Sequence, residues 1–161
     1  MYNHHLKKLK NFIVLYPLSI TLLFIFFYWD SSPLAHTLNQ WQINLSAFLT
    51  SLTLPKGTMQ ENYIFISHKL TLVIDKSCNG LIPYFFFLAS VLAFPSTLIH
   101  KIKWAIFGYF LLTLLNVFRI WFISQLVINE EENFNLAHDY LGNMFLVFSA
   151  LMLFVFFIKN R

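Results

Sequence analysis

Three side chains of this 161-residue chain could act together as a cysteine acyl-transfer site. Cys78 is the only cysteine, Arg119 is the single charge within a long apolar run, and His138 stands at the start of another apolar run. A thiolate nucleophile, a fixed cation and an imidazole that moves a proton are the three groups that such chemistry requires. Whether the three groups meet depends on the elements that carry them.

The residues around Cys78 predict that the thiol lies at a helix N-terminus. An apolar run begins at Gly80, and Pro83 must lie in its first turn, because a ring without an N–H is tolerated only there. Asn79 or a neighbour is therefore the expected N-cap. The partial positive charge of the helix N-terminus favours thiolate over thiol at Cys78. Taken alone, a lone cysteine in an apolar protein is more often a small buried hydrophobic residue.

Arg119 lies in an otherwise uncharged run of 25 residues. An isolated guanidinium at membrane depth costs about 2.5 to 3.5 kcal/mol, so other groups must compensate it. Asn116 stands three residues earlier on the same helix face and offers an amide carbonyl toward the bundle interior. Interhelical contact would explain this pair. A fixed cation facing an anionic group in a water-filled cleft would explain it too, and is the usual role of a charge within a membrane.

The composition argues against a soluble domain and excludes several kinds of site. Hydrophobic residues make up 58% of the chain and charged residues only 11%, against about 25% charged in soluble proteins. One cysteine excludes an intramolecular disulfide and a paired-cysteine redox site, and no histidine shows metal-ligand spacing, so we expect neither metal nor cofactor. The net charge of +4 comes from short basic clusters beside apolar runs, which indicates membrane topology rather than a nucleic-acid surface.

The apolar runs predict an all-α polytopic membrane protein, a single membrane domain over residues 1–161. We expect four transmembrane helices, at about residues 12–29, 80–96, 104–128 and 139–158. The basic clusters around Lys7, Lys101 and Arg161 then share one side, which the positive-inside rule assigns to the cytoplasm together with both termini. The outer segment 30–77 and the three reactive side chains fall on the opposite side of a cell membrane.

The outer segment is expected to hold an interfacial helix and a small β-hairpin. From Leu34 to Leu54 apolar residues recur at helical spacing and polar residues occupy the other faces, which predicts an amphipathic helix lying in the outer interface. The β-branched and aromatic runs Tyr63–Ser67 and Leu70–Asp75 predict the hairpin, just before the second span. Asp75 and Asp139 are both candidates to orient His138 or to pair with Lys76.

Taken together, three motifs resemble the exosortase/archaeosortase family of membrane cysteine proteases and transpeptidases, as a minimal-size member. The motifs are Cys78-Asn79-Gly80-Leu81, Leu115-Asn116-Val117-Phe118-Arg119-Ile120 and Ala137-His138-Asp139, within a resemblance that covers roughly Leu45 to Phe157. The resemblance implies that Cys78 is the nucleophile, that Arg119 supports the thiolate or oxyanion, and that His138 shuttles the proton. Asn116, Asn79 and Gly80 are the expected supporting residues.

The same resemblance implies the substrates. They would be exported proteins whose C-terminal tail holds a short motif such as Pro-Glu-Pro, a transmembrane helix and a basic end. The expected activity is cleavage of that sorting signal just outside the lipid bilayer through a cysteine acyl-enzyme, with no nucleic-acid partner. A non-catalytic membrane subunit is the alternative, in which Arg119 and Asn116 bind a partner helix and Cys78 is inert.

Overall fold

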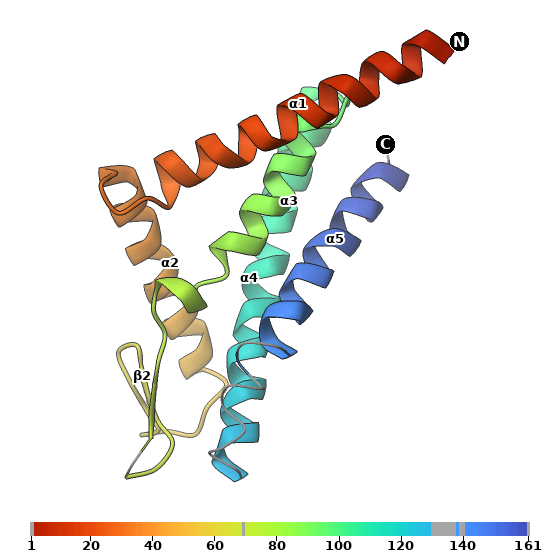
Figure 1. Ribbon diagram of the computed structural model, residues 1–161. Helices are drawn as coiled ribbons and strands as arrows, with labels where there is room; N and C mark the ends of the chain where they lie inside the picture. Colours follow the sequence, from red (N-terminus) through yellow and green to blue (C-terminus); the bar gives the residue numbers. More distant parts are fainter. Residues whose placement is uncertain (1, 69, 130–137, 139–140, 161) are drawn as a thin grey trace.

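The computed structural model describes residues 2–68, 70–129, 138 and 141–160, and is mostly helical (Figure 1). Its elements follow one another as α1 (Tyr2–Phe27), α2 (Pro33–Ser51), β1 (Met59–Gln60), β2 (Tyr63–Phe65), β3 (Thr71–Val73), the 3-10 turn η1 (Lys76–Cys78), α3 (Leu81–Ala93), α4 (Leu98–Asn129) and α5 (Asn143–Lys159).

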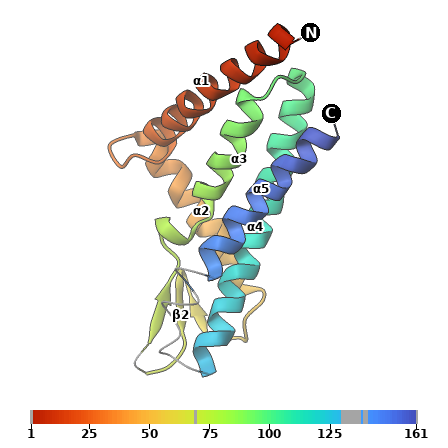
Figure 2. The same cartoon turned by 45° about the vertical axis from the view of Figure 1, so that its right-hand side comes forward.

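Helices α3, α4 and α5 form a bundle whose members contact one another, and α1 crosses obliquely over α3 (Figures 1 and 2). The N-terminus, the C-terminus and the junction between α3 and α4 lie toward one end of the molecule. The small sheet lies at the other end, where α4 finishes, and α2 runs from the end of α1 toward that sheet. The segment that carries Cys78 therefore joins the sheet to the bundle.

Among the residues that the structure describes, two helices are long and apolar enough to cross a membrane, over Leu9–Phe27 and Leu98–Val127. The other two apolar helices, α3 and α5, have 13 and 17 residues. At 1.5 Å per residue they are about 20 Å and about 26 Å long, less than the roughly 30 Å of a hydrocarbon core. The four expected spans thus appear as two full-length and two short apolar helices.

Helix α4 starts earlier than expected, at Leu98 instead of residue 104, and has 32 residues. Lys101 and Lys103, expected in a loop, lie within the helix. The reason is that the helix-breaking residues end at Pro95, and Thr97 accepts a hydrogen bond from the amide of His100 at 3.4 Å in the first turn. The helix is therefore about 48 Å long and extends beyond the thickness of a bilayer core.

Helix α2 forms close to the expected residues, but part of its polar face is turned inward, unlike that of an interfacial helix. Asn39 and Gln42 are buried at 6% and 1% exposure, whereas Trp41 and Phe48 are 59% and 62% exposed. Gln40 and Asn44 are exposed, so the interfacial arrangement is wrong only for the buried stripe. The amides turn inward because they hydrogen-bond to buried groups of the Cys78 segment and α4, and the apolar face is left on the outside.

The sheet has three antiparallel strands in the order β1-β2-β3, where the sequence predicted two. Strands β2 and β3 fall within the two runs that were expected to pair. Strand β1 adds two residues that the sequence pattern did not predict as a strand. The buried face of the sheet carries Ile64, Leu72 and Ile74, which pack with Ala47 of α2 and Ile120 of α4. This packing fixes the sheet, and the chain that leaves it, against α4.

Candidate active site

Asp75 shapes the turn that presents the thiol. Its Oδ1 accepts hydrogen bonds from the Ser77 amide at 2.8 Å, the Ser77 hydroxyl at 2.6 Å and the Cys78 amide at 3.3 Å. Burial raises the pKa of Asp75, but these hydrogen bonds outweigh burial and hold the pKa below the usual carboxyl value. Lys76 forms an ion pair with Asp30 rather than with Asp75. Asp75 is therefore the N-cap of η1, and Asp139 lies outside the described residues.

Gly80 is the N-cap of α3, in the left-handed conformation with φ +78°. A Cβ at this position would lie 2.9 Å from Cγ of Asn116, so both the backbone angle and the close approach of α4 require glycine. Asn79 still acts locally, because its Oδ1 accepts a hydrogen bond from the Leu81 amide at 3.0 Å. The tight turn brings the Cys78 segment directly onto α4.

Four amide side chains hold the Cys78 segment from behind; we call Asn39, Gln42, Asn79 and Asn116 the amide network. Asn79 donates to Oδ1 of Asn39 at 2.8 Å, and Gln42 donates to the backbone oxygen of Asn79 at 3.1 Å. Asn116 donates to the backbone oxygen of Cys78 at 2.8 Å. Asn79 and Asn116 are fully buried. Low local dielectric strengthens such bonds, so the network fixes the backbone at Cys78 and Asn79.

Sequence analysis missed Asn39 and Gln42, although a signal was present. Both lie on the face of α2 that also carries Ser46 and Thr50, a polar stripe in a chain poor in polar residues. The amphipathic pattern predicted that this helix lies in the outer interface, with its polar residues outside the protein core. In a membrane protein a polar stripe can equally well mark the surface that packs against other helices.

Arg119 is 3% exposed and lies behind the thiol and imidazole. Its Nη2 donates to Oδ1 of Asn143 at 2.9 Å and to the backbone oxygen of His138 at 3.4 Å, and its Nη1 donates to Oδ1 of Asn116 at 3.4 Å. Arg119 therefore ties α4 to the start of α5 and to His138. Asn143 was also missed; the only sequence signal was an amide at the edge of an apolar run.

The sulfur of Cys78 lies 3.1 Å from Nε2 of His138, 60 residues later in the chain. Burial raises the pKa of the Cys78 thiol. The hydrogen bonds with His138 and Ser77, together with the positive charges of His138 and Arg119, outweigh burial, so the pKa of Cys78 lies below its ordinary value. The arrangement can therefore hold a thiolate beside an imidazole. Among the described residues, no group of three or more His, Cys, Asp or Glu side chains could hold a metal ion.

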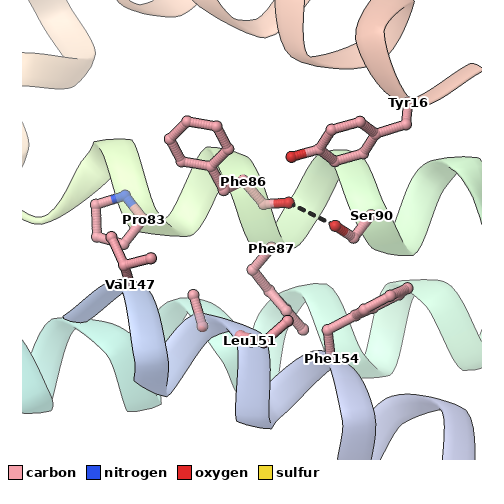
Figure 3. A pocket seen from close by; sticks show the side chains of 9 residues that line it. Tyr16, Pro83, Phe86, Phe87, Ser90, Val147, Leu151 and Phe154 are labelled. Atoms are coloured by element: carbon pink, nitrogen blue, oxygen red, sulfur yellow. Dashed lines mark hydrogen bonds between the residues drawn. The ribbon is translucent and has the colours of Figure 1, made fainter. Parts of the chain in front are cut away.

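An open cavity of about 430 Å³ reaches His138, and Ser77, Gly80, Arg119 and Asn143 are also among its lining residues. Pro83 and Val147 also line it, and the same two residues line a neighbouring apolar cavity of about 200 Å³ between α1, α3 and α5. Figure 3 shows this second cavity. The two cavities therefore adjoin along α3 and α5.

The second cavity is walled mainly by aromatic and aliphatic side chains. Tyr16 approaches Ser90 from α1, and the Ser90 hydroxyl donates to the backbone oxygen of Phe86 at 2.8 Å (Figure 3). Phe87 and Phe154 line the cavity from α3 and α5. This surface is suited to an apolar helix rather than to a hydrated ligand.

The family model described as transmembrane exosortase matches residues 10–155, which include Cys78, Arg119 and His138. No curated protein and no solved structure matches the chain.

Proposed function

Since the chain belongs to the transmembrane exosortase family, we propose that it is a membrane thiol protease or transpeptidase that cleaves a C-terminal sorting signal of exported proteins just outside the membrane. The observation that carries this proposal is the 3.1 Å contact between the Cys78 sulfur and Nε2 of His138. A nucleophile within hydrogen-bond reach of a base is the arrangement that covalent catalysis needs.

In the proposed reaction the Cys78 thiolate attacks the carbonyl carbon of the scissile peptide bond. A sulfur–carbon bond forms, and the carbonyl electron pair moves to the oxygen. As the tetrahedral intermediate collapses, the carbon–nitrogen bond breaks and protonated His138 gives its proton to the leaving amine. Water or an amine acceptor then attacks the thioester and gives its proton to His138; the sulfur–carbon bond breaks, which releases the thiolate and regenerates the enzyme. Hydrolysis and transfer differ only in that last nucleophile.

Arg119 has an electrostatic role in this proposal. Its contacts with Asn116, Asn143 and the backbone of His138 hold the guanidinium beside the reacting pair. Its charge lowers the pKa of the Cys78 thiol and favours negative charge that develops on the substrate oxygen. Asn116, Asn79 and Gly80 act as positioning residues, because they hold the Cys78 backbone and touch no reacting atom.

We propose that α1, α3, α4 and α5 all cross the membrane, with both termini in the cytoplasm and the thiol on the outer side. The chain ends and the α3–α4 junction lie toward one end of the molecule, which supports the placement of the basic residues on one side (Figure 1). Short helices such as α3 can be accommodated by local thinning of the bilayer.

The apolar cavity between α1, α3 and α5 is the proposed docking place for the substrate's transmembrane helix (Figure 3). Its continuity with the cavity at His138, through Pro83 and Val147, supports this assignment. A helix seated there would place the extended chain that precedes it beside the thiol. The substrate would then be held at two points, by its helix in the bilayer and by its scissile segment at the site.

Coexpression tests the proposal. Candidate proteins with a motif, a transmembrane helix and a basic tail are expressed with the wild-type chain or with Cys78→Ala, and the C-terminal fragment is followed by immunoblot. Release by wild type alone supports the assignment, and a thioester-linked intermediate that hydroxylamine releases would identify the step. Release of the fragment at the same rate by Cys78→Ala would contradict the assignment of Cys78 as the nucleophile.

A non-catalytic membrane subunit is the second candidate, because the contacts of Arg119 with Asn116 and Asn143 would equally well join α4 to α5 for a purely structural purpose. The reactivity of Cys78 separates the two. A thiol with lowered pKa and an open cavity should react quickly with a membrane-impermeant maleimide added to intact cells, whereas an inert structural thiol should resist it.

A further inference from the structure

A small apolar pocket lies between the sheet and α4, and it shares Arg119 and His138 with the open cavity at Asn143. Its aliphatic wall comes from the sheet and from α4, and the reacting pair completes it: Ile64, Leu72, Ile120, Ile123, Cys78 and His138 are among its lining residues. The bond-making steps of the proposed reaction need no apolar cavity here. The pocket is therefore available to hold part of a substrate.

The size of the pocket limits what it can hold. Its volume is about 40 Å³. By the same measure this is about a tenth of the 430 Å³ of the open cavity, so the pocket favours a small group over a large one. A small aliphatic side chain would be desolvated against aliphatic neighbours, whereas an aromatic ring needs more room.

Strand β3 gives a way to deliver such a side chain. It is one of the two edge strands of the sheet formed by the described residues, and β1 is the other. The Ile74 amide donates to Asn62 at 2.8 Å and the Leu70 carbonyl accepts from Ile66 at 3.1 Å, so the even-numbered residues of β3 face β2. Because backbone groups alternate along a strand, those of Thr71 and Val73 point to the outer edge. That edge leads within a few residues to Cys78.

We propose that an extended substrate segment pairs with the outer edge of β3 and places a small aliphatic side chain, that of the residue whose carbonyl is attacked, in this pocket. The inference rests on the proposed function and adds the feature by which the site selects its substrate. An added strand gains main-chain hydrogen bonds, and every second side chain faces the sheet's packed side. Because Cys78 lines the pocket, the pocketed residue is the one that carries the scissile carbonyl.

Peptide chloromethyl ketones test the pocket without a known substrate. The probes are N-acetyl-Ala-Ala-X-chloromethyl ketones with X as Ala, Val, Leu or Phe, applied to the full chain in lipid nanodiscs. The Cys78 thiolate displaces chloride, and the rate is followed by mass spectrometry. We expect Val to react fastest and Phe at least about tenfold more slowly. An N-methyl group on the amide that pairs with β3 should slow the Val probe by a similar factor. Iodoacetamide, which has no side chain, measures the intrinsic reactivity of the thiol.

Substitutions in α4 test whether this pocket is the source of the preference for small side chains. Ile123→Ala enlarges the pocket and should raise the Phe-to-Val rate ratio about tenfold. The matched control is Val127→Ala, one turn further along α4, equally buried and outside the pocket lining; it should leave the ratio unchanged. If Ile123→Ala fails to fold, Ile120→Val provides a smaller enlargement with a smaller rise in the ratio.

The outcomes separate this inference from the proposed function. Two results would contradict the pocket while Cys78 still reacts normally with iodoacetamide: equal rates for all four ketones, or equal Phe-to-Val rate ratios in Ile123→Ala and Val127→Ala. Either result would leave the proposed thiol chemistry unaffected. If neither iodoacetamide nor any ketone reacts with Cys78, the proposed function fails, and the pocket assignment fails with it.

Discussion

The two ends of the helical bundle are held together by different forces. At the sheet end, the amide network fixes the Cys78 segment through directional hydrogen bonds of 2.8–3.1 Å. At the end near the chain termini, an aromatic cluster of Phe12, Phe94, Phe154 and Phe157 joins α1, α5 and the end of α3, with ring centroids 5.8–6.4 Å apart.

The difference follows from what each end must do. Aromatic pairs are favourable over a broad range of centroid separations, about 4.5–7 Å, which suits an end whose task is cohesion. Hydrogen bonds constrain both distance and direction, and a reacting sulfur must be held within fractions of an ångström of its base. Substitutions at the two ends should therefore affect catalysis and stability in opposite proportions.

The largest effect is expected from Cys78→Ala, which removes the reacting atom and leaves both ends in place. Turnover should fall to the background level while the thermal unfolding temperature changes little. Cys78→Ser should also fail, because the positive charges that lower a thiol pKa cannot deprotonate a hydroxyl at neutral pH. Normal activity in either variant would show that the thiol at the sheet end is not the nucleophile.

His138→Ala should slow turnover by about 10²- to 10⁴-fold, because the leaving amine loses its proton donor. It should also change the thiol. His138 lowers the pKa of Cys78 by hydrogen bond and by charge, so its removal raises that pKa. The pH at which iodoacetamide alkylation reaches half its maximal rate should consequently move upward. An unchanged alkylation profile would show that the 3.1 Å contact has no influence on the thiolate.

Arg119→Lys should reduce turnover on the order of tenfold to a hundredfold while the protein still inserts. Lysine keeps a charge, but its single ammonium cannot reach Asn116, Asn143 and the His138 backbone in the fork geometry of a guanidinium. A hydrogen bond to a charged group contributes about 1.5–3 kcal/mol, which sets the range. Full activity with lysine would reduce the role to a generic positive charge.

Asn116→Ala probes the amide network directly and should lower turnover about tenfold. It leaves the backbone oxygen of Cys78 without its side-chain donor, a loss of about 1–3 kcal/mol. The matched control is Asn44→Ala, an exposed amide of α2, which should retain full turnover. Equal effects of the two substitutions on turnover would mean that the network does not position the thiol.

The smallest effect on turnover is expected from Phe157→Ala in the aromatic cluster. Phe157 is fully buried, and its truncation should lower the free energy of unfolding by about 3–5 kcal/mol. Turnover per folded molecule should stay close to wild type, since Phe157 itself lines neither the site nor the cavity proposed for the substrate helix. A turnover loss as large as that of Asn116→Ala would contradict the division between the two ends.

Sequence alone determined the parts that depend on local chemistry. The apolar runs located the helices that became α1, α3, α4 and α5, and Pro83 placed the start of α3 correctly. Spacing and residue type singled out Cys78, Arg119 and His138, and the motifs they carry indicated the family that the match over residues 10–155 shows. The periodicity between Leu34 and Leu54 likewise identified α2 as a helix.

Only the tertiary structure decided which surfaces meet. Periodicity shows that Asn39 and Gln42 share a face of α2, but not whether water or protein covers that face. In water an apolar face turns inward, whereas beside lipid it can stay outside and the polar face becomes the packing surface. The contact of Cys78 with His138 and the support of Arg119 by Asn143 join residues that lie far apart in the chain. Such contacts depend on how whole helices pack, and local sequence carries no record of that packing.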